Sequence, residues 1–320
     1  MGDAASWQSV GRLAAARYFF LQGGAGAIWW AMLALVPKSR LWFFPAANPS
    51  TLLSALVYAD VALFVFGSIG AGLLCRRSAR LASAAAGFIT GVVAYAFLLS
   101  LGLLFTSGQG ELGVIMMAAA TLMCGLCLLL ITSSEAIGRT FRPANPAASH
   151  AKHTFIQSAA FWALFLGVLP AFLAWLEHRV GIPAPARSTS LSLAGIALFV
   201  AAGTLGVTSS TFMVRRGRGT PLPTSACTQL VTAGPYRHVR NPMAIAGLLQ
   251  GAAIALVLAS PLTLLYVVLG ALVWDCVVRP LEEHDLHLRF GEEYDAYRQR
   301  VRCWVPLPNT VISPSGAARS

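Results

Sequence analysis

Charged residues are scarce in this chain. Only 11% of its 320 residues are Asp, Glu, Lys or Arg, whereas a soluble globular domain carries about 25%. Hydrophobic residues make up 57% of the chain, and the mean hydropathy is +0.68. So little charge excludes an ordinary soluble domain. It predicts an all-α, polytopic membrane protein, because helices satisfy every backbone hydrogen bond inside a bilayer.

Acidic residues and lysine are also rare. The chain has 12 Asp and Glu against 23 Lys and Arg, which gives a formal net charge of +11. In a membrane protein this excess indicates topology and contact with anionic lipid head groups, so we expect membrane lipids as partners and no nucleic acid. Arginine far outnumbers lysine, and Ala and Gly are abundant. This bias indicates a GC-rich bacterial genome and hence the bacterial inner membrane.

Cysteine is limited to six residues, which we place within the membrane or on its cytosolic side, where disulfides are not expected. Cys124 and Cys127 have C-x-x-C spacing inside an apolar segment. That context favours packing over a metal or redox site, and we predict no metal site. The first apolar run has no clear small-residue cleavage site after it, so we do not expect a secretory signal peptide.

Long apolar runs recur along the chain. Segments that can cross a hydrocarbon core of roughly 30 Å predict about eight transmembrane helices, followed by a C-terminal amphipathic helix on the cytosolic side, interrupted near Gly291. The expected spans are Tyr18–Val36, Leu52–Leu74, Ala84–Phe105, Leu112–Ile131, Phe155–Leu176, Leu191–Val214, Pro242–Ala259 and Leu262–Val278.

The basic residues fix the expected orientation. With the N-terminus in the cytosol, the other side of the membrane holds only Lys38, Arg40, Arg179 and Arg187 of the 23 basic residues. Cytosolic loops carry an excess of Lys and Arg. We therefore expect both termini in the cytosol.

A polar, proline-containing loop at Thr132–Thr154, with His150 and His153, divides the chain. We expect an N-terminal four-helix membrane region of unknown role at 1–140, a second membrane domain at 155–308 with its site at 234–305, and a flexible tail at 309–320. Small residues at four-residue spacing predict close helix packing in the first half. The pairs are Gly67/Ala71, Ser68/Gly72 and Gly87/Gly91.

Asp60 is the only acidic residue deep within the first half. An ionisable residue inside a membrane segment is a functional hypothesis by default. The alternative interpretation, which we favour at this point, is a protonated or hydrogen-bonded Asp near the outer end of its helix.

Two charged motifs frame the last two apolar segments. The first reads G-P-Y-R-H-V-R-N-P-M at Gly234–Met243 and the second R-P-L-E-E-H-D-L at Arg279–Leu286. The apolar segments between them form a hairpin that returns both motifs to one membrane face. Asn241-Pro242 is a typical helix start, and a helix N-terminus favours a carboxylate or phosphate.

Carboxylates follow at the other end of this hairpin. Asp275, Arg279 and Glu282 have i, i+4, i+7 spacing and would share one helix face, and Pro280 would turn the carboxylates toward the first motif. Cations beside carboxylates suit a zwitterionic ligand. These charges could instead be simple interface anchors, but acidic residues on the cytosolic side, interleaved with Tyr and His, favour a site.

The order of these motifs resembles a known family. Gly234, Tyr236 and Arg240-Asn241-Pro242 precede the hairpin, and Glu282-Glu283 and the run Phe290–Tyr297 follow it, before a closing Val301, Trp304 and Pro306. This pattern is similar to the isoprenylcysteine carboxyl methyltransferase and phosphatidylethanolamine methyltransferase superfamily. The resemblance implies an S-adenosylmethionine-dependent membrane methyltransferase acting on a lipophilic substrate that enters from the bilayer.

The resemblance also implies roles for residues of the two motifs. Tyr236, His238, Asn241, Pro242, Gly247 and Glu282 would bind S-adenosylmethionine, and Arg240, Glu282 and Glu283 would be catalytic. The chain departs from the common R-H-P-x-Y pattern, with Asn241 for the His and Ala244 for the Tyr, so the methyl acceptor stays open. So does the oligomeric state. Two alternatives remain: an NADPH-dependent sterol-reductase-like enzyme using Arg215, Arg216 and Arg218, and a non-catalytic transporter or assembly factor.

Overall fold

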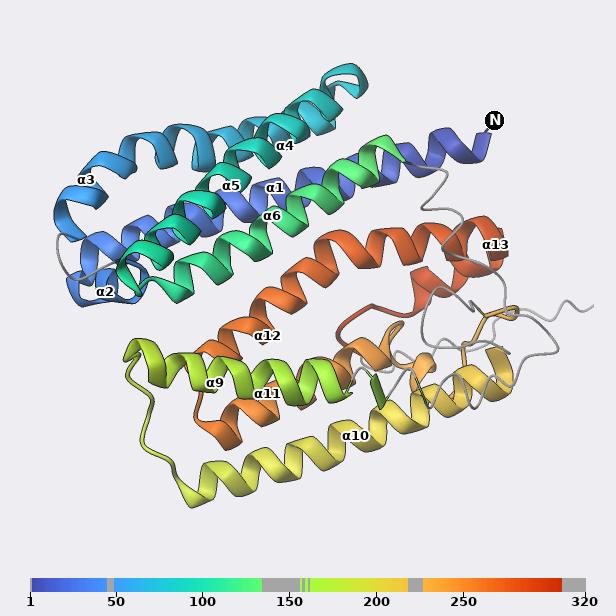
Figure 1. The fold of residues 1–320 in the computed structure, drawn as a ribbon. Coiled ribbons are helices and arrows are strands. Elements are labelled where there is room, and N and C mark those ends of the chain that lie inside the picture. The colour runs from blue at the N-terminus through green and yellow to red at the C-terminus, as the bar shows by residue number, and fades with distance from the viewer. Residues whose placement is uncertain are drawn as a thin grey trace, which may run out of the picture.

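The computed structural model describes residues 2–44, 49–133, 156, 159–160, 162–217 and 227–306. Every regular element in these ranges is helical (Figure 1), which confirms the expected all-α fold for this part of the chain. The α-helices are α1 (Gly2–Leu35), α2 (Arg40–Phe43), α3 (Pro49–Ala59), α4 (Gly67–Arg77), α5 (Ala79–Ser107), α6 (Glu111–Thr132), α9 (Leu169–Val180), α10 (Thr189–Gly217), α11 (Pro242–Leu258), α12 (Pro261–Val273) and α13 (Arg279–Arg300).

Short helical segments of other types connect some of these helices. Two are 3-10 turns, η1 (Pro37–Ser39) and η5 (Gly234–Arg237). Three are π-helical: η2 (Asp60–Phe66), η3 (Trp162–Val168) and η6 (Trp274–Val278). Because η2 and η6 continue directly into α4 and α13, the helices run on through them.

Seven helical stretches among the described residues are long and apolar enough to cross a membrane. They coincide with seven of the eight expected spans. The remaining one, α11, has 17 residues, or about 26 Å at 1.5 Å per residue, which is short of a roughly 30 Å core. An eighth crossing by α11 therefore stays a prediction.

The last stretch, Pro261–Arg300, has 40 residues and would be about 60 Å long. That is twice the thickness of the hydrocarbon core, so the charged α13 extends beyond it. The expected interruption of this helix is confirmed: Gly291 has non-helical backbone angles (φ 51°, ψ −126°).

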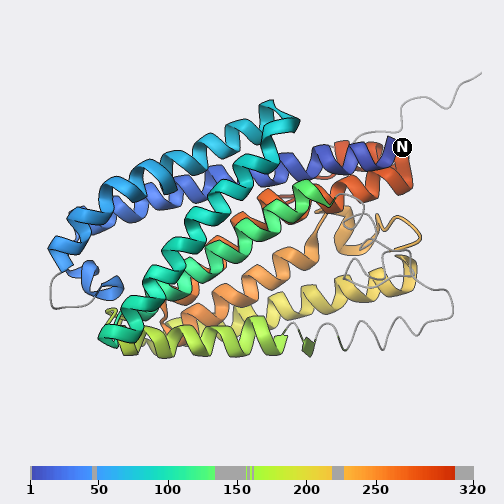
Figure 2. The same cartoon turned by 45° about the horizontal axis from the view of Figure 1, so that its top comes forward.

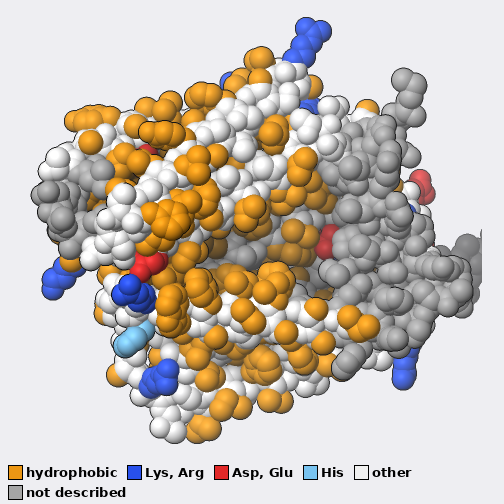
Figure 3. All heavy atoms as spheres, viewed as in Figure 1, with side chains coloured by type: hydrophobic (Ala, Val, Ile, Leu, Met, Phe, Trp, Pro, Cys, Tyr) orange, Lys and Arg blue, Asp and Glu red, His pale blue; other side chains and the backbone are white. Residues whose placement is uncertain are grey.

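The long helices run back and forth, so the bundle has two ends (Figures 1 and 2). At the end that we call the motif end, the Trp7 ring of α1 packs edge-on against His284 of α13 at 4.7 Å. At the opposite end, Glu111 of α6 pairs with Arg179 of α9 at 3.4 Å. Hydrophobic side chains cover the middle of the face in Figure 3, and Lys and Arg lie toward its edges.

Helix α1 is the centre of the N-terminal half. It packs against α4 and α6, and Cys124 and Cys127 are fully buried in that core. Gly72 allows this packing, because a Cβ there would lie 3.1 Å from the Ala16 carbonyl oxygen. The expectation for Gly87/Gly91 is wrong: a Cβ at either position would meet nothing within 4 Å.

Helices α10, α11 and α12 frame the second half. Gly195 brings α10 close to α11, because a Cβ there would lie 2.8 Å from the Ala253 carbonyl oxygen. Ser260 begins α12 by accepting a hydrogen bond from the Thr263 N–H at 3.0 Å. The expected α11–α12 hairpin is therefore present, and it returns the chain to the motif end.

Candidate active site

A glycine turn places the first charged motif. Gly234 has a φ of 64°, in the left-handed region that other residues rarely adopt. A Cβ at this position would also lie 2.6 Å from the Phe212 ring of α10. The turn begins η5, which leads to Arg240, whose N–H donates to the Arg302 carbonyl at 2.9 Å. The motif is therefore held between α10 and the segment after α13.

Arg240 braces this loop against α13. Its guanidinium donates to Glu283 Oε1 at 2.7 Å and to the Val301 carbonyl at 2.7 Å. A further contact reaches the Arg298 carbonyl at 3.2 Å. The Arg240 and Glu283 side chains are only 12% and 16% exposed, so this pair is largely shielded from solvent. Its contacts fix where α11 begins relative to α13.

Asn241 and Glu282 form a second link beside the first. The Asn241 side chain caps α11 by accepting from the Ala244 N–H at 3.2 Å, and its Nδ2 donates to Glu282 Oε2 at 3.1 Å. Pro242 occupies the first helical position, so the predicted helix start is confirmed. Since Asn241 also accepts from Ile245 and Pro242 has no N–H, Met243 carries the remaining N–H of this first turn.

The Glu282 carboxyl is a strongly perturbed group of this site. It keeps some solvent contact but is closely surrounded by protein atoms, and burial raises its pKa from 4.5 to about 7. The Asn241 hydrogen bond opposes that shift, while the neighbouring Glu283 adds to it. A carboxyl that changes protonation near neutral pH is suited to acid–base work.

Tyr236 lies beneath these residues. Its carbonyl accepts from the Tyr297 hydroxyl at 2.6 Å, and its own side chain is only 5% exposed. Within the described residues the buried Tyr236 hydroxyl has no hydrogen-bond partner. Burial raises its pKa, so it stays a neutral donor. An unpaired buried hydroxyl costs free energy unless something binds it, which favours a ligand at this position.

The other predicted residues lie around this group. His238 is exposed, and its ring nitrogen Nε2 accepts a hydrogen bond from Arg237 Nε at 3.1 Å. Gly247 is half-buried on α11. Asp275 pairs with Arg279 at 3.1 Å, whereas Glu282 contacts Asn241 instead. The expected i, i+4 contact is therefore present, and only Glu282 departs from the set, because its carboxyl accepts from Asn241 at the start of α11.

Several polar contacts at this end were not predicted. Trp304 Nε1 donates to Asp275 Oδ1 at 2.8 Å. Arg289 pairs with Asp285 and donates to the Cys227 carbonyl. The i, i+4 spacing of Asp285 and Arg289 was a usable signal; the Trp304 contact spans the kink at Gly291 and had none.

Three predicted segments lie outside the described residues. These are Arg218 with the following Gly- and Pro-rich loop, the loop with His150 and His153, and the tail at 309–320. Arg216 belongs to the basic group that the reductase alternative would use to bind nicotinamide phosphates. Its guanidinium lies over the Phe212 ring, 5.4 Å from the ring centre.

These features define an α-helical integral membrane protein with a polar, hydrogen-bonded site at one end of its bundle. Residues 191–293 match the phospholipid methyltransferase family, which confirms the resemblance over that range. The match runs from α10 into α13 and includes both motifs. No match was found among curated proteins or among solved structures.

The family uses S-adenosylmethionine, so this chain is an S-adenosylmethionine-dependent membrane methyltransferase. Lipids are the substrates that the family implies. The match favours the methyltransferase over the reductase and transporter alternatives.

Proposed function

We propose that the motif end binds S-adenosylmethionine between the start of α11 and Glu282, and that it methylates an amine-bearing phospholipid. The observation that carries this proposal is the Asn241–Glu282 contact of 3.1 Å. It joins a helix N-terminus to a carboxylate, and Tyr236 beneath them carries an unpaired buried hydroxyl. The cofactor supplies a methyl group activated on a sulfonium.

The residues present fit such a zwitterion. The cofactor's carboxylate suits the α11 N-terminus, where the dipole is positive and Met243 has an N–H to offer. Its ammonium suits the carboxylates, and Tyr236 can donate to a cofactor oxygen or nitrogen acceptor. Pro242 and Gly247 leave little side-chain bulk on the first turns of α11, while His238 lies at the exposed rim.

Glu282 is the group best suited to receive a proton from the acceptor. A lipid ammonium must lose a proton before its nitrogen can attack a methyl group. Glu282 has a pKa raised to about 7 by burial, near the value that favours proton transfer at neutral pH. Arg240 and Glu283 are occupied with each other, so we assign them to positioning rather than to direct chemistry.

The Glu282 carboxyl also bears on the choice of acceptor. A prenylcysteine-type substrate presents a carboxylate, which ionised Glu282 would repel, whereas Glu283 is already paired with Arg240. An amine head group has the complementary charge. We propose further that the protein lies in a bacterial inner membrane with the motif end in the cytosol, as the distribution of basic residues favours.

Methyl transfer to defined lipids tests this proposal. Purified protein in nanodiscs with phosphatidylethanolamine would receive S-adenosylmethionine carrying a radioactive methyl group. We expect label in base-stable N-methylated lipid, an activity that Glu282→Gln lowers at least about 100-fold and that Glu292→Gln, an exposed change on α13, leaves intact. Label recovered only as a base-labile ester of a prenylcysteine substrate would refute the amine acceptor.

A further inference from the structure

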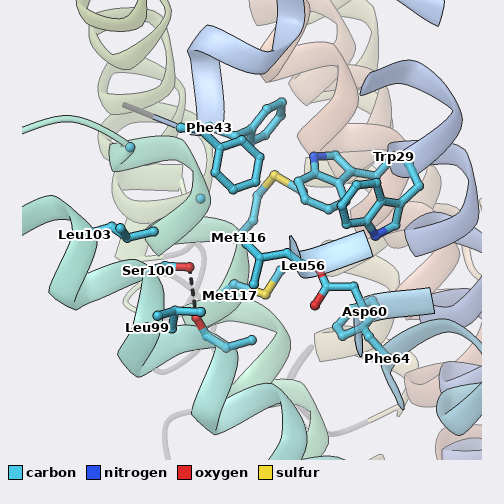
Figure 4. Close-up of a pocket in the computed structure, with 15 residues that line it drawn as sticks. Trp29, Phe43, Leu56, Asp60, Phe64, Leu99, Ser100, Leu103, Met116 and Met117 are labelled. Atoms are coloured by element: carbon cyan, nitrogen blue, oxygen red, sulfur yellow. Dashed lines mark hydrogen bonds between the residues drawn. The ribbon is translucent and has the colours of Figure 1, made fainter. Parts of the chain in front are cut away.

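A cavity lies at the opposite end of the bundle, within the N-terminal half (Figure 4). About 750 Å³ of space between its walls is free of protein atoms, a figure that includes space open to the outside, so only a small part of it is enclosed. Its walls include five aromatic rings, from Trp29, Trp30, Phe43, Phe44 and Phe64.

This cavity is separate from the methyltransferase site. All of its lining residues fall between Trp29 and Met117, outside the matched range 191–293. Trp7 contacts α13 at the motif end, and Trp29 lies 22 residues further along the same helix. That separation is about 33 Å at 1.5 Å per residue, so the two sites lie near opposite faces of the membrane.

Asp60 is the charged residue of this cavity. Its carboxyl group points toward Leu56 and Met117 among the lining side chains (Figure 4). Among the described residues, Asp60 has no hydrogen-bond or ion-pair partner, and the cavity lining contains no Lys or Arg. The Ser100 hydroxyl, also in the lining, already donates to the Ala96 carbonyl at 2.8 Å. The hydrogen-bonded alternative considered for Asp60 thus finds no support there.

The backbone at Asp60 is unusual as well. The π-helical segment η2 begins at this residue and runs to Phe66, so it holds both Asp60 and Phe64. Such π-helical stretches are rare and frequently occur at functional sites. In the facing wall, the Trp29 indole N–H is buried without a partner among the described residues.

We propose that this cavity binds a lipophilic ammonium ion, with its cationic nitrogen beside Asp60 and its apolar chain among the aromatic and Met side chains. Rings attract cations through their negatively charged faces, and aromatic cages are typical sites for quaternary ammonium groups. An unpaired carboxylate in a membrane segment is costly, and a bound cation removes that cost. A neutral lipid would leave the carboxylate unpaired, and an anion would be repelled.

Binding of a simple probe tests this inference. Radioactive dodecyltrimethylammonium, below its micellar concentration, would be titrated onto the full chain in phosphatidylcholine nanodiscs, with empty nanodiscs as background. We expect saturable binding, and at least a tenfold weaker competition from dodecyldimethylphosphine oxide, whose head group is neutral. Asp60→Asn should weaken binding of the ammonium probe at least tenfold.

Matched variants separate this effect from general damage. Glu111→Gln removes a carboxylate at the same end that lies outside the lining and pairs with Arg179, so it should bind the probe as the unaltered chain does. Trp30→Leu should also weaken binding, because it removes a wall ring while keeping Asp60. S-adenosylmethionine binding by each variant reports on folding. Wild-type affinity in both Asp60→Asn and Trp30→Leu, or no saturable binding above empty nanodiscs, would overturn the proposal.

Discussion

The two ends of this bundle hold their carboxylates in different ways. At the motif end, Glu283 is paired with Arg240 at 2.7 Å and Glu282 accepts from Asn241 at 3.1 Å. At the opposite end, Asp60 lies in an aromatic cavity and has no such partner among the described residues.

This difference separates two uses of a shielded charge. A paired charge is costly to break and holds two segments in register, as Arg240 and Glu283 hold the loop before α11 against α13. An unpaired carboxylate holds nothing in place and has its charge available for a ligand. The comparison therefore predicts opposite effects on stability when each end is altered.

Breaking the paired end should have the largest effect. Arg240→Met leaves Glu283 shielded and without its closest cation, and it frees the Val301 carbonyl. Removing one partner of a buried pair costs about 3–5 kcal/mol. We expect the free energy of unfolding, measured by SDS titration in mixed micelles, to fall by about that amount, and methyl transfer to fall with it.

Arg298→Met is the matched control, because Arg298 also approaches Glu283, at 3.7 Å, but is 54% exposed. Exposed pairs contribute about 0–1 kcal/mol. Equal losses for the two variants would show that the Arg240 brace has no special role.

Glu282 should make both stability and activity depend on pH. Burial raises the pKa of Glu282 from 4.5 to about 7, so the folded chain holds this proton more tightly than the unfolded chain. Stability should therefore fall as pH rises from 4.5 to about 7, by up to about 3 kcal/mol. Methyl transfer should rise over the upper part of that window, because the ionised carboxylate is the form that accepts a proton.

Glu282→Gln should remove this dependence. We expect the unfolding free energy of this variant to lose the part of its pH dependence that Glu282 causes between those pH values. Its turnover should stay low throughout. A pH profile of Glu282→Gln that matches the unaltered chain in both measurements would assign the titration to another group. Glu292→Gln, on the exposed part of α13, should keep the original profile.

Much of the helical framework could be predicted from the sequence. Apolar length and turn residues are local signals, so they located the spans, the Asn241-Pro242 helix start and the break at Gly291. The pairing of the two motifs also followed, because a helical hairpin must return its ends to one side. The family pattern then supplied the cofactor.

The arrangement of side chains could not be predicted in the same way. The Arg240 brace depends on the carbonyls of Arg298 and Val301, which any residue type could offer. The spacing of Asp275, Arg279 and Glu282 predicted the Asp275–Arg279 pair but not the contact of Glu282 with Asn241, 41 positions earlier in the chain. The cavity around Asp60 gathers residues from helices far apart in the chain, so hydropathy alone gave no sign of it.

Gly234 should show how strictly the motif end is positioned. Gly234→Ala places a Cβ in a left-handed conformation and 2.6 Å from the Phe212 ring. We expect a loss of about 2 kcal/mol, and an increase in the KM for S-adenosylmethionine. Phe212→Leu should restore part of the loss by relieving the contact but not the backbone strain. Gly270→Ala, where a Cβ meets nothing within 4 Å, should be nearly neutral.

The smallest effect, with the opposite sign, is expected at the unpaired end. Asp60→Asn keeps the shape of the side chain and removes a charge that no described residue pairs with, so folding loses no ion pair and avoids the cost of a charge in the membrane. The free energy of unfolding should stay constant or rise by about 1 kcal/mol, while binding of the ammonium probe weakens. Glu283→Gln, the same change at the paired end, should lower stability because Arg240 loses its carboxylate. If both variants destabilise the chain equally, Asp60 has a structural partner and the contrast between the two ends fails.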